Sequence, residues 1–138
     1  MVRSGRHLAR RCAVQALYQW EVTGQSPSEI ESSFIKNENL CGPHLDYFLT
    51  LIKNIPLNAE AIDNLITPHL DRNLDKVDLI EHAILRVGTY ELKFQPEVPT
   101  RVALDEAIDL AKVFASEHSY KYVNGVLDKI ARAVRGDA

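Results

Sequence analysis

The sequence has few of the residue types and runs on which many protein classes depend. Only two cysteines occur in 138 residues, Cys12 and Cys41, and they form no Cys-x-x-Cys pair, so we predict reduced thiols and no structural zinc. No apolar run approaches the ~18 to 20 residues of a membrane span. The start of the chain also lacks the apolar run of a secretory signal. These absences predict a cytoplasmic protein without membrane contact.

Signatures of catalysis are equally scarce. The five histidines are scattered without metal-ligand spacing, and no glycine-rich loop could cradle a phosphate. Neither cysteine has a histidine partner in the sequence. The carboxylates of Asp105, Glu106 and Asp109 are interpreted as the solvated face of a helix. The sequence therefore predicts a protein that is not an enzyme and that uses no metal and no cofactor.

The charge that is present is unevenly distributed. The formal net charge is -3 and the sequence pI about 5.9, which argues against a protein coated in nucleic acid. The first 20 residues nevertheless contain four arginines and no carboxylate. A local cationic patch on an acidic body is typical of a protein that binds a polyanion at one place. Charge alone leaves open the alternative of a solvated basic tail.

Helical periodicity runs through every long segment, and no segment alternates in the manner of a half-buried strand. We therefore predict an all-α protein with a single domain over residues 1–138. Ser28 with Glu31 is interpreted as a capping box, and Thr100 as a helix cap. The predicted helices cover, approximately, residues 5–22, 28–37, 44–55, 59–66, 78–93, 100–114 and 120–134.

Basic side chains and an aromatic one share a side of the first predicted helix. At about 100° per residue, its cations fall opposite Cys12 and Ala16, and Tyr18 lies on the cationic side. Cations neutralise phosphates and an aromatic face can stack an unpaired base, a combination suited to single-stranded RNA. An ordinary basic helix start and a tyrosine that packs on the protein are the alternatives. The basic residues of this arc are Arg6, His7, Arg10 and Arg11.

Two residues of later helices are unusual for their positions. Glu81 shares an arc with Ile84, so it either completes a capping box with Asp78 or presents a charge to a protein partner inside an apolar patch. Gly125 lies in a helix interior, where glycine costs about 1 kcal/mol relative to alanine. We predict that another helix approaches closely there. Alternatively, Lys121 and Asn124 beside it could reach a phosphate or a base edge.

Four blocks of the sequence resemble the NusB family of transcription antitermination factors. The likeness covers essentially the whole chain, although residues 23–76 match only in helical layout. It implies a compact bundle of about seven helices in two packed subgroups that binds the boxA element of RNA. The blocks are residues 10–20 (RRCAVQALYQW), 81–92 (EHAILRVGTYEL), 99–112 (PTRVALDEAIDLAK) and 120–129 (YKYVNGVLDK).

The resemblance also implies partners and site residues. NusB proteins pair with NusE, a small-subunit ribosomal protein, and the pair holds boxA more tightly than NusB alone. With other Nus factors this tethers the RNA of ribosomal RNA operons to elongating RNA polymerase and suppresses termination. The residues that we predict for RNA binding are Arg6, Arg10, Arg11, Gln15, Phe114, His118, Lys121 and Asn124, and those that we predict for partner binding are Tyr18, Glu81, Ile84 and Leu85. The resemblance implies all of them except His118, Ile84 and Leu85.

One departure and two alternatives follow from the comparison with the family. Family members commonly place an acidic residue at position 118 and a small one at position 120, where this chain has His118 and Tyr120. The main alternative is a NusB-like helical adapter related to ribosomal RNA cytosine methyltransferases, although no glycine-rich cofactor motif is present. A second alternative is an adapter that binds only proteins, but it would not explain the arginine cluster near the start of the chain. The sequence leaves a homodimer in the absence of NusE open.

Overall fold

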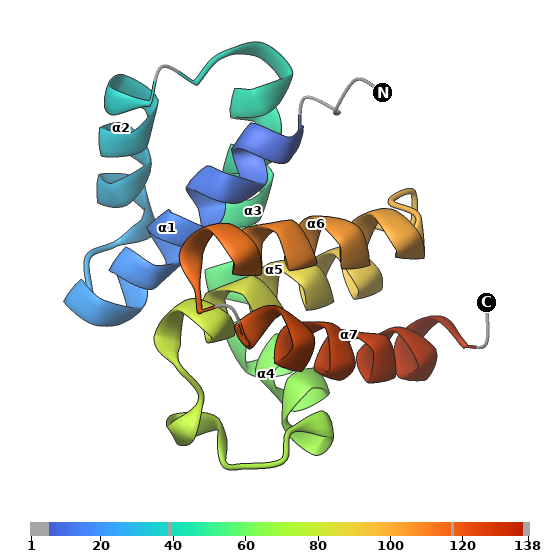
Figure 1. The fold of residues 1–138 in the computed structure, drawn as a ribbon. Helices are drawn as coiled ribbons and strands as arrows, with labels where there is room; N and C mark the ends of the chain where they lie inside the picture. Colours follow the sequence, from blue (N-terminus) through green and yellow to red (C-terminus); the bar gives the residue numbers. More distant parts are fainter. Residues whose placement is uncertain (1–5, 39, 117, 137–138) are drawn as a thin grey trace. The chain divides into compact units, whose positions relative to one another are not determined.

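Helices make up all the regular structure in the part of the chain that is described. The computed structural model describes residues 6–38, 40–116 and 118–136, and seven α-helices and two short 3-10 helices occur there without a strand. The predicted all-α class is confirmed. The chain divides into two compact units, Met1–Asn58 and Ala59–Ala138, which Figure 1 shows in blue to green and in green to red respectively.

The helix bounds agree with the periodicity of the sequence to within a few residues. The fourth helix has the bounds that were predicted for it, whereas α3 runs through Pro56, beyond the predicted end at residue 55. The first unit contains α1 (Arg6–Thr23), α2 (Pro27–Asn37) and α3 (Gly42–Leu57). The second contains α4 (Ala59–Ile66), η1 (Thr67–His69), η2 (Leu74–Lys76), α5 (Leu79–Phe94), α6 (Thr100–Phe114) and α7 (Ser119–Arg135).

In the first unit, α1 packs on α3, and α2 packs on both. Small residues line the buried side of α1, including Ala9 and Ala13, which are fully buried. From α3, Phe48 and Leu51 are fully buried. Phe34 of α2 stacks on Phe48, with ring centroids 5.8 Å apart. The unit therefore has an apolar core built from all three of its helices.

The N-terminus of α2 differs from the prediction. The capping box is formed by Ser26 and Glu29, not by Ser28 and Glu31. The Glu29 amide donates to the Ser26 hydroxyl at 3.3 Å, and the Ser26 amide donates to the Glu29 carboxylate at 3.3 Å. Pro27 is the first helical residue, where its fixed φ suits the helix and its missing N–H costs nothing. The proline therefore starts the helix earlier than the Ser28 pattern indicated.

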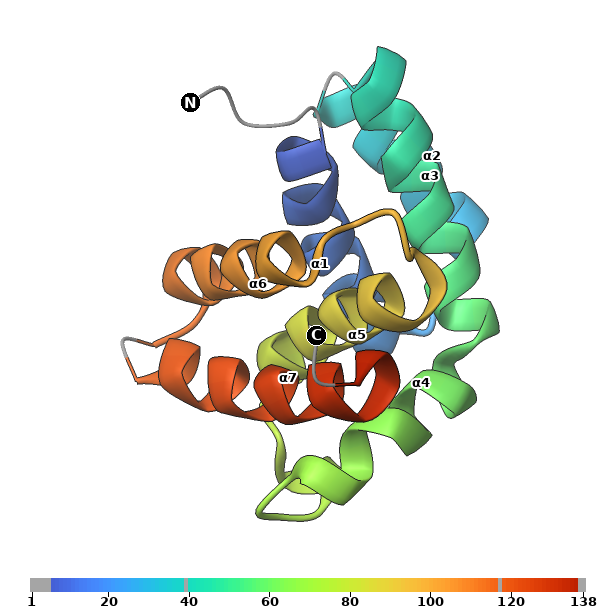
Figure 2. The same cartoon turned by 90° about the vertical axis from the view of Figure 1, so that its right-hand side faces the viewer.

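The second unit is arranged around α5, which packs against α4, α6 and α7 (Figure 2). Every residue from Glu81 to Leu92 is buried. Gly88 allows α7 to approach closely, because a Cβ at this position would lie 2.9 Å from Cδ1 of Leu127. The close helix contact that was predicted at Gly125 is absent: that residue is exposed, and no atom of another described helix lies within 4 Å of its ideal Cβ.

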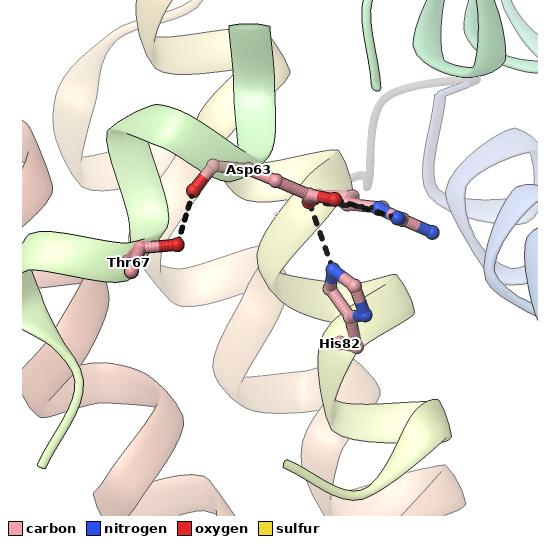
Figure 3. Close-up of polar contacts among 4 residues, drawn as sticks. Asp63, Thr67 and His82 are labelled. Carbon is pink, nitrogen blue, oxygen red and sulfur yellow. Dashed lines mark hydrogen bonds and ion pairs between the residues drawn. The ribbon is translucent and has the colours of Figure 1, made fainter. Parts of the chain in front are cut away.

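A polar cluster joins α4 to α5 (Figure 3). The Arg86 guanidinium donates to both carboxylate oxygens of Asp63, at 3.0 and 2.8 Å, and His82 Nε2 lies 2.8 Å from Asp63 Oδ1. Burial raises the pKa of Asp63, but the hydrogen bonds and charges of His82 and Arg86 outweigh it, so that the pKa lies below its usual value. The cluster holds two helices together through a carboxylate that stays charged.

The end of α7 clasps the connection between α5 and α6. The Arg135 guanidinium makes five hydrogen bonds, four of them to main-chain carbonyl oxygens near the end of α5 and in the following connection. Thr100 is the first residue of α6 and its hydroxyl is one of these acceptors, whereas Pro99 takes the cap position that was predicted for Thr100. The acceptors are the carbonyls of Glu91 (3.0 Å), Leu92 (2.9 Å), Gln95 (3.0 Å) and Val98 (2.6 Å) and the hydroxyl of Thr100 (3.2 Å).

Candidate nucleic-acid interface

The solvent-facing side of α1 changes character along its length. Arg11 and Gln15 are exposed at positions four residues apart, and therefore lie side by side on successive turns. Tyr18 (41% exposed) and Val22 (53% exposed) continue the same side of the helix. We call these four residues the α1 stripe. Its first half offers a cation and an amide, and its second half offers apolar surface.

Arg10 does not belong to this surface. Its side chain is buried, with 1% exposure, and its guanidinium carbon lies 5.6 Å from the centroid of the Tyr47 ring on α3. Arg10 precedes Ala13 by three residues and Leu17 by seven, which places it on the buried side of α1. The prediction that Arg10 binds RNA directly is therefore wrong, and its charge instead helps to hold α1 on α3.

Arg6 has an intermediate position between these two roles. It is half-buried, and its guanidinium carbon lies 4.2 Å from the centroid of the same Tyr47 ring. A guanidinium stacked on an aromatic ring still has N–H donors at its edge. Arg6 therefore remains a candidate for a phosphate contact beside Arg11.

In the second unit, the predicted RNA-binding residues gather around the start of α7. Lys121 and Asn124 are exposed one turn apart on α7, and His118 is exposed at its N-cap position. Phe114, the last residue of α6, is half-buried. A cation the sequence analysis did not select is also nearby, because Lys112 Nζ lies 4.9 Å from the centroid of the Tyr120 ring. Lys112 and Tyr120 are eight residues apart and lie on different helices, so the sequence pattern does not predict that they are in contact.

A hollow of about 430 Å³ lies between the start of α5 and the connection from α6 to α7. It brings Phe114, a predicted RNA-binding residue, together with Glu81, a predicted partner-binding residue. Its remaining lining residues are Asp78, Ile80, Ala115, Ser116 and Ser119.

Glu81 is only partly explained by capping of α5. Asp78 caps the helix, accepting hydrogen bonds from the amides of Ile80 at 3.0 Å and Glu81 at 3.2 Å. The return bond of a capping box is missing, and among the described residues the Glu81 carboxylate has no hydrogen bond or ion pair. Glu81 is 9% exposed. The charge of Arg72 acts on Glu81 without forming an ion pair. A nearly buried carboxylate that makes no direct hydrogen bond or ion pair, at the edge of a hollow, could pair with a basic group of another molecule.

Ile84 and Leu85 are core residues. Both are fully buried at 0% exposure, so neither side chain offers surface to a partner. Their predicted partner contacts do not fit this structure. The apolar arc of α5 that contains Ile84 faces the interior of the second unit.

The two groups of predicted RNA-binding residues belong to different units. Arg6, Arg11 and Gln15 form a surface of the first unit, whereas the residues around the start of α7 form a surface of the second. Each surface pairs an exposed cation with an exposed amide one turn further on: Arg11 with Gln15, and Lys121 with Asn124.

The described part of the chain contains no group of metal ligands, and the buried cysteine Cys12 is unreactive. No three histidine, cysteine or acidic side chains are grouped there as metal ligands would be. Burial, together with the charge of Glu38, raises the pKa of Cys12 to about 11, although Arg11 lowers it. Its thiol is therefore protonated at neutral pH. None of the described helices has the length and apolar character that crossing a membrane requires.

Comparison with known proteins gives a consistent result over nearly the whole chain. Residues 7–132 match the model of the NusB family. A transcription antitermination protein NusB of Pasteurella multocida is 52% identical over 128 residues, covering 93% of this chain and 89% of the relative. A protein with the same description from Photorhabdus laumondii is 44% identical over 132 residues, covering 96% of each chain. The crystal structure of antitermination factors NusB and NusE in complex with dsRNA is similar with a TM-score of 0.86 and 31% identity, covering 94% of this chain and 97% of that one.

Proposed function

Because the chain belongs to the NusB family, we propose that it is a transcription antitermination factor that binds the boxA element of ribosomal RNA operons. It does so as a heterodimer with NusE and, with other Nus factors, couples the RNA to elongating RNA polymerase in the cytoplasm. It acts by holding RNA and protein and catalyses no reaction. When NusE is absent, a second copy of the chain can take the partner's place.

The observation that carries the RNA-binding part is the repeated pairing of a cation with an amide. Arg11 and Gln15 on α1, and Lys121 and Asn124 on α7, are all exposed. A cation neutralises phosphate, and a carboxamide can donate to a phosphate or pair with a base edge. Such local surfaces can bind RNA even though the chain has a net charge of -3.

The partner-binding part is supported by Glu81 and Tyr18. The Glu81 carboxylate lines a hollow and makes no hydrogen bond or ion pair among the described residues, although the charge of Arg72 acts on it from further away. A basic side chain of NusE would complete it. Tyr18 is 41% exposed in the apolar half of the α1 stripe, and an aromatic side chain of this kind is a typical interface anchor. A similar solved structure contains NusB together with NusE.

Titration of labelled boxA RNA at several salt concentrations tests the RNA-binding part. Arg11→Ala and Lys121→Ala should each weaken binding and reduce the slope of log K against log salt by about 0.7, the value for one lost phosphate contact on a single strand. Lys36→Ala and Lys93→Ala remove exposed cations outside the two surfaces and should leave the slope unchanged. Equal slopes for all four variants and the unmodified chain would show that the RNA site lies elsewhere.

The strandedness of the RNA is tested in the same assay. The similar complex contains double-stranded RNA, whereas the exposed amides favour single-stranded RNA, whose base edges are accessible. We expect single-stranded boxA RNA to bind more tightly than a duplex of the same sequence. A duplex that binds equally well would indicate recognition of the phosphate backbone alone.

A further inference from the structure

We infer that Gly125 is the point at which the sugar-phosphate backbone of the bound RNA crosses α7, and that its missing side chain is required for binding. This inference rests on the function proposed above. It identifies a contact made by bare helix backbone, between the side chains of Lys121 and Asn124 and the next turn of the helix.

The fold itself gives no reason for a glycine at this position. Gly125 lies in the interior of α7 (Ser119–Arg135), where glycine lowers helix stability relative to alanine. Its φ is not positive, so the backbone does not demand a residue without a Cβ. It is exposed, and apart from its chain neighbours and the adjacent backbone of α7, no described atom lies within 4 Å of the ideal Cβ.

Gly88 shows what an internal reason looks like. A Cβ at that position would meet the buried Leu127 side chain at 2.9 Å. Gly88 is thus explained by close packing of α5 on α7 within the unit. The open space over Gly125 indicates that whatever comes close to it belongs to another molecule.

The surroundings of Gly125 indicate a polyanion rather than an apolar partner. Lys121 lies one turn before Gly125 on the same side of α7, and Asn124 is its neighbour, and both are exposed. No large apolar side chain of α7 is exposed within the described structure. A backbone that enters the gap at Gly125 can thus place a phosphate against the Lys121 ammonium and present a sugar or base to the Asn124 amide.

The turn of α7 that follows Gly125 carries charges of both signs. The Asp128 carboxylate forms an ion pair with the Arg132 guanidinium at 3.0 Å. The Asp128 side chain is 46% exposed and the Arg132 side chain 70%. Asp128 would repel a phosphate, whereas the exposed Lys129, one turn after Gly125 on the same side of α7, would attract one. The strand is therefore expected to cross the helix at Gly125, between the ammonium groups of Lys121 and Lys129.

The test separates helix stability from RNA binding. Gly125→Ala and Gly125→Gln should both raise the melting temperature of the full chain, by about 2 to 5 °C, because both residues favour helix over glycine. They should nevertheless weaken binding of boxA RNA, by roughly tenfold for alanine and more for glutamine, since the larger side chain displaces the strand further from Lys121 and Asn124. Ala133→Gln, at another exposed position of α7, is the matched control and should bind RNA normally.

The outcomes distinguish this inference from the proposed function. If Lys121→Ala weakens binding while both Gly125 variants bind like the unmodified chain, the proposed function stands and the inference about Gly125 is overturned. If the unmodified chain does not bind boxA RNA, the proposed function fails, and the inference fails with it. If both Gly125 variants are more stable and bind less tightly, and Ala133→Gln binds normally, the inference is supported.

Discussion

Removal of the Arg135 guanidinium should be among the most destabilising single changes at a partly exposed position. The side chain donates five hydrogen bonds at 2.6 to 3.2 Å, to carbonyls of α5 and its following connection and to the Thr100 hydroxyl. Arg135→Met retains the apolar part of the side chain and removes all the donors. Hydrogen bonds from a charged donor contribute about 1.5 to 3 kcal/mol each when fully buried.

The expected magnitude is smaller than the sum of five such bonds. Arg135 is half-buried, so water can replace some of the lost donors, and bonds made by one group are not additive. We therefore expect a loss of about 2 to 4 kcal/mol in the free energy of unfolding. For a chain of 138 residues this corresponds to a decrease of about 7 to 14 °C in melting temperature.

Thermal melts with two further variants make this prediction specific. Arg135→Lys keeps the charge but replaces a planar fork by a single ammonium, and should recover less than half of the loss. Arg132→Met removes a 70%-exposed arginine from the same helix and should change the melting temperature by less than about 2 °C. If Arg135→Met melted within 2 °C of the unmodified chain, the clasp would contribute little and the reasoning would be refuted.

Three other predictions concern charged groups whose surroundings the structure reveals. The pKa of Asp63 is lowered in the folded chain, so its stabilising effect should be present above its usual pKa and lost as pH falls through the folded-state value. In thermal melts, the difference in stability between the unmodified chain and Asp63→Asn should therefore shrink below about pH 4. Glu81→Lys should weaken NusE binding in calorimetric titration by about 2 kcal/mol or more, yet leave the binding of boxA RNA by the isolated chain largely intact; normal NusE affinity with a lower melting temperature would show that Glu81 only supports the helix start. Arg10→Ala should lower the melting temperature, because it removes a buried side chain beside Tyr47. At a temperature where the variant is folded, the salt slope of its RNA binding should be unchanged, and a reduced slope would indicate that Arg10 contacts a phosphate.

The helices could be predicted from the sequence because their signals are local. The apolar period of α4 and the Asp78 cap of α5 lie within the segments that they define, and both are found in the structure. The start of α2 was misplaced although the signal was present, since Pro27 after Ser26 is a typical first turn. Local rules thus determine where helices occur and, less accurately, where they begin.

The polar contacts could not be predicted because their partners are distant in the chain. Asp63 meets His82 and Arg86 across 19 and 23 residues, and Arg135 reaches acceptors 35 to 44 residues away. No periodicity within one helix indicates which carboxylate will face which cation on another.

The candidate surface was predicted in part, for a related reason. Periodicity distinguishes an apolar arc from a polar one, but it does not show how far a neighbouring helix reaches around the side. Arg10 was assigned to the exposed arc, whereas α3 provides the Tyr47 ring beside it. Gly125 was recognised as unusual, but only the structure shows that the space above it is open.

The two cysteines differ in a way that is useful for chemistry in the test tube. Cys12 is 1% exposed and has a pKa of about 11, so only on the order of one molecule in ten thousand carries the reactive thiolate there at neutral pH. Cys41, at the N-cap of α3, is exposed. A thiol-specific dye added to the folded chain should therefore attach at Cys41 alone. The chain thus offers a single natural attachment point for a reporter on its first unit, without any substitution.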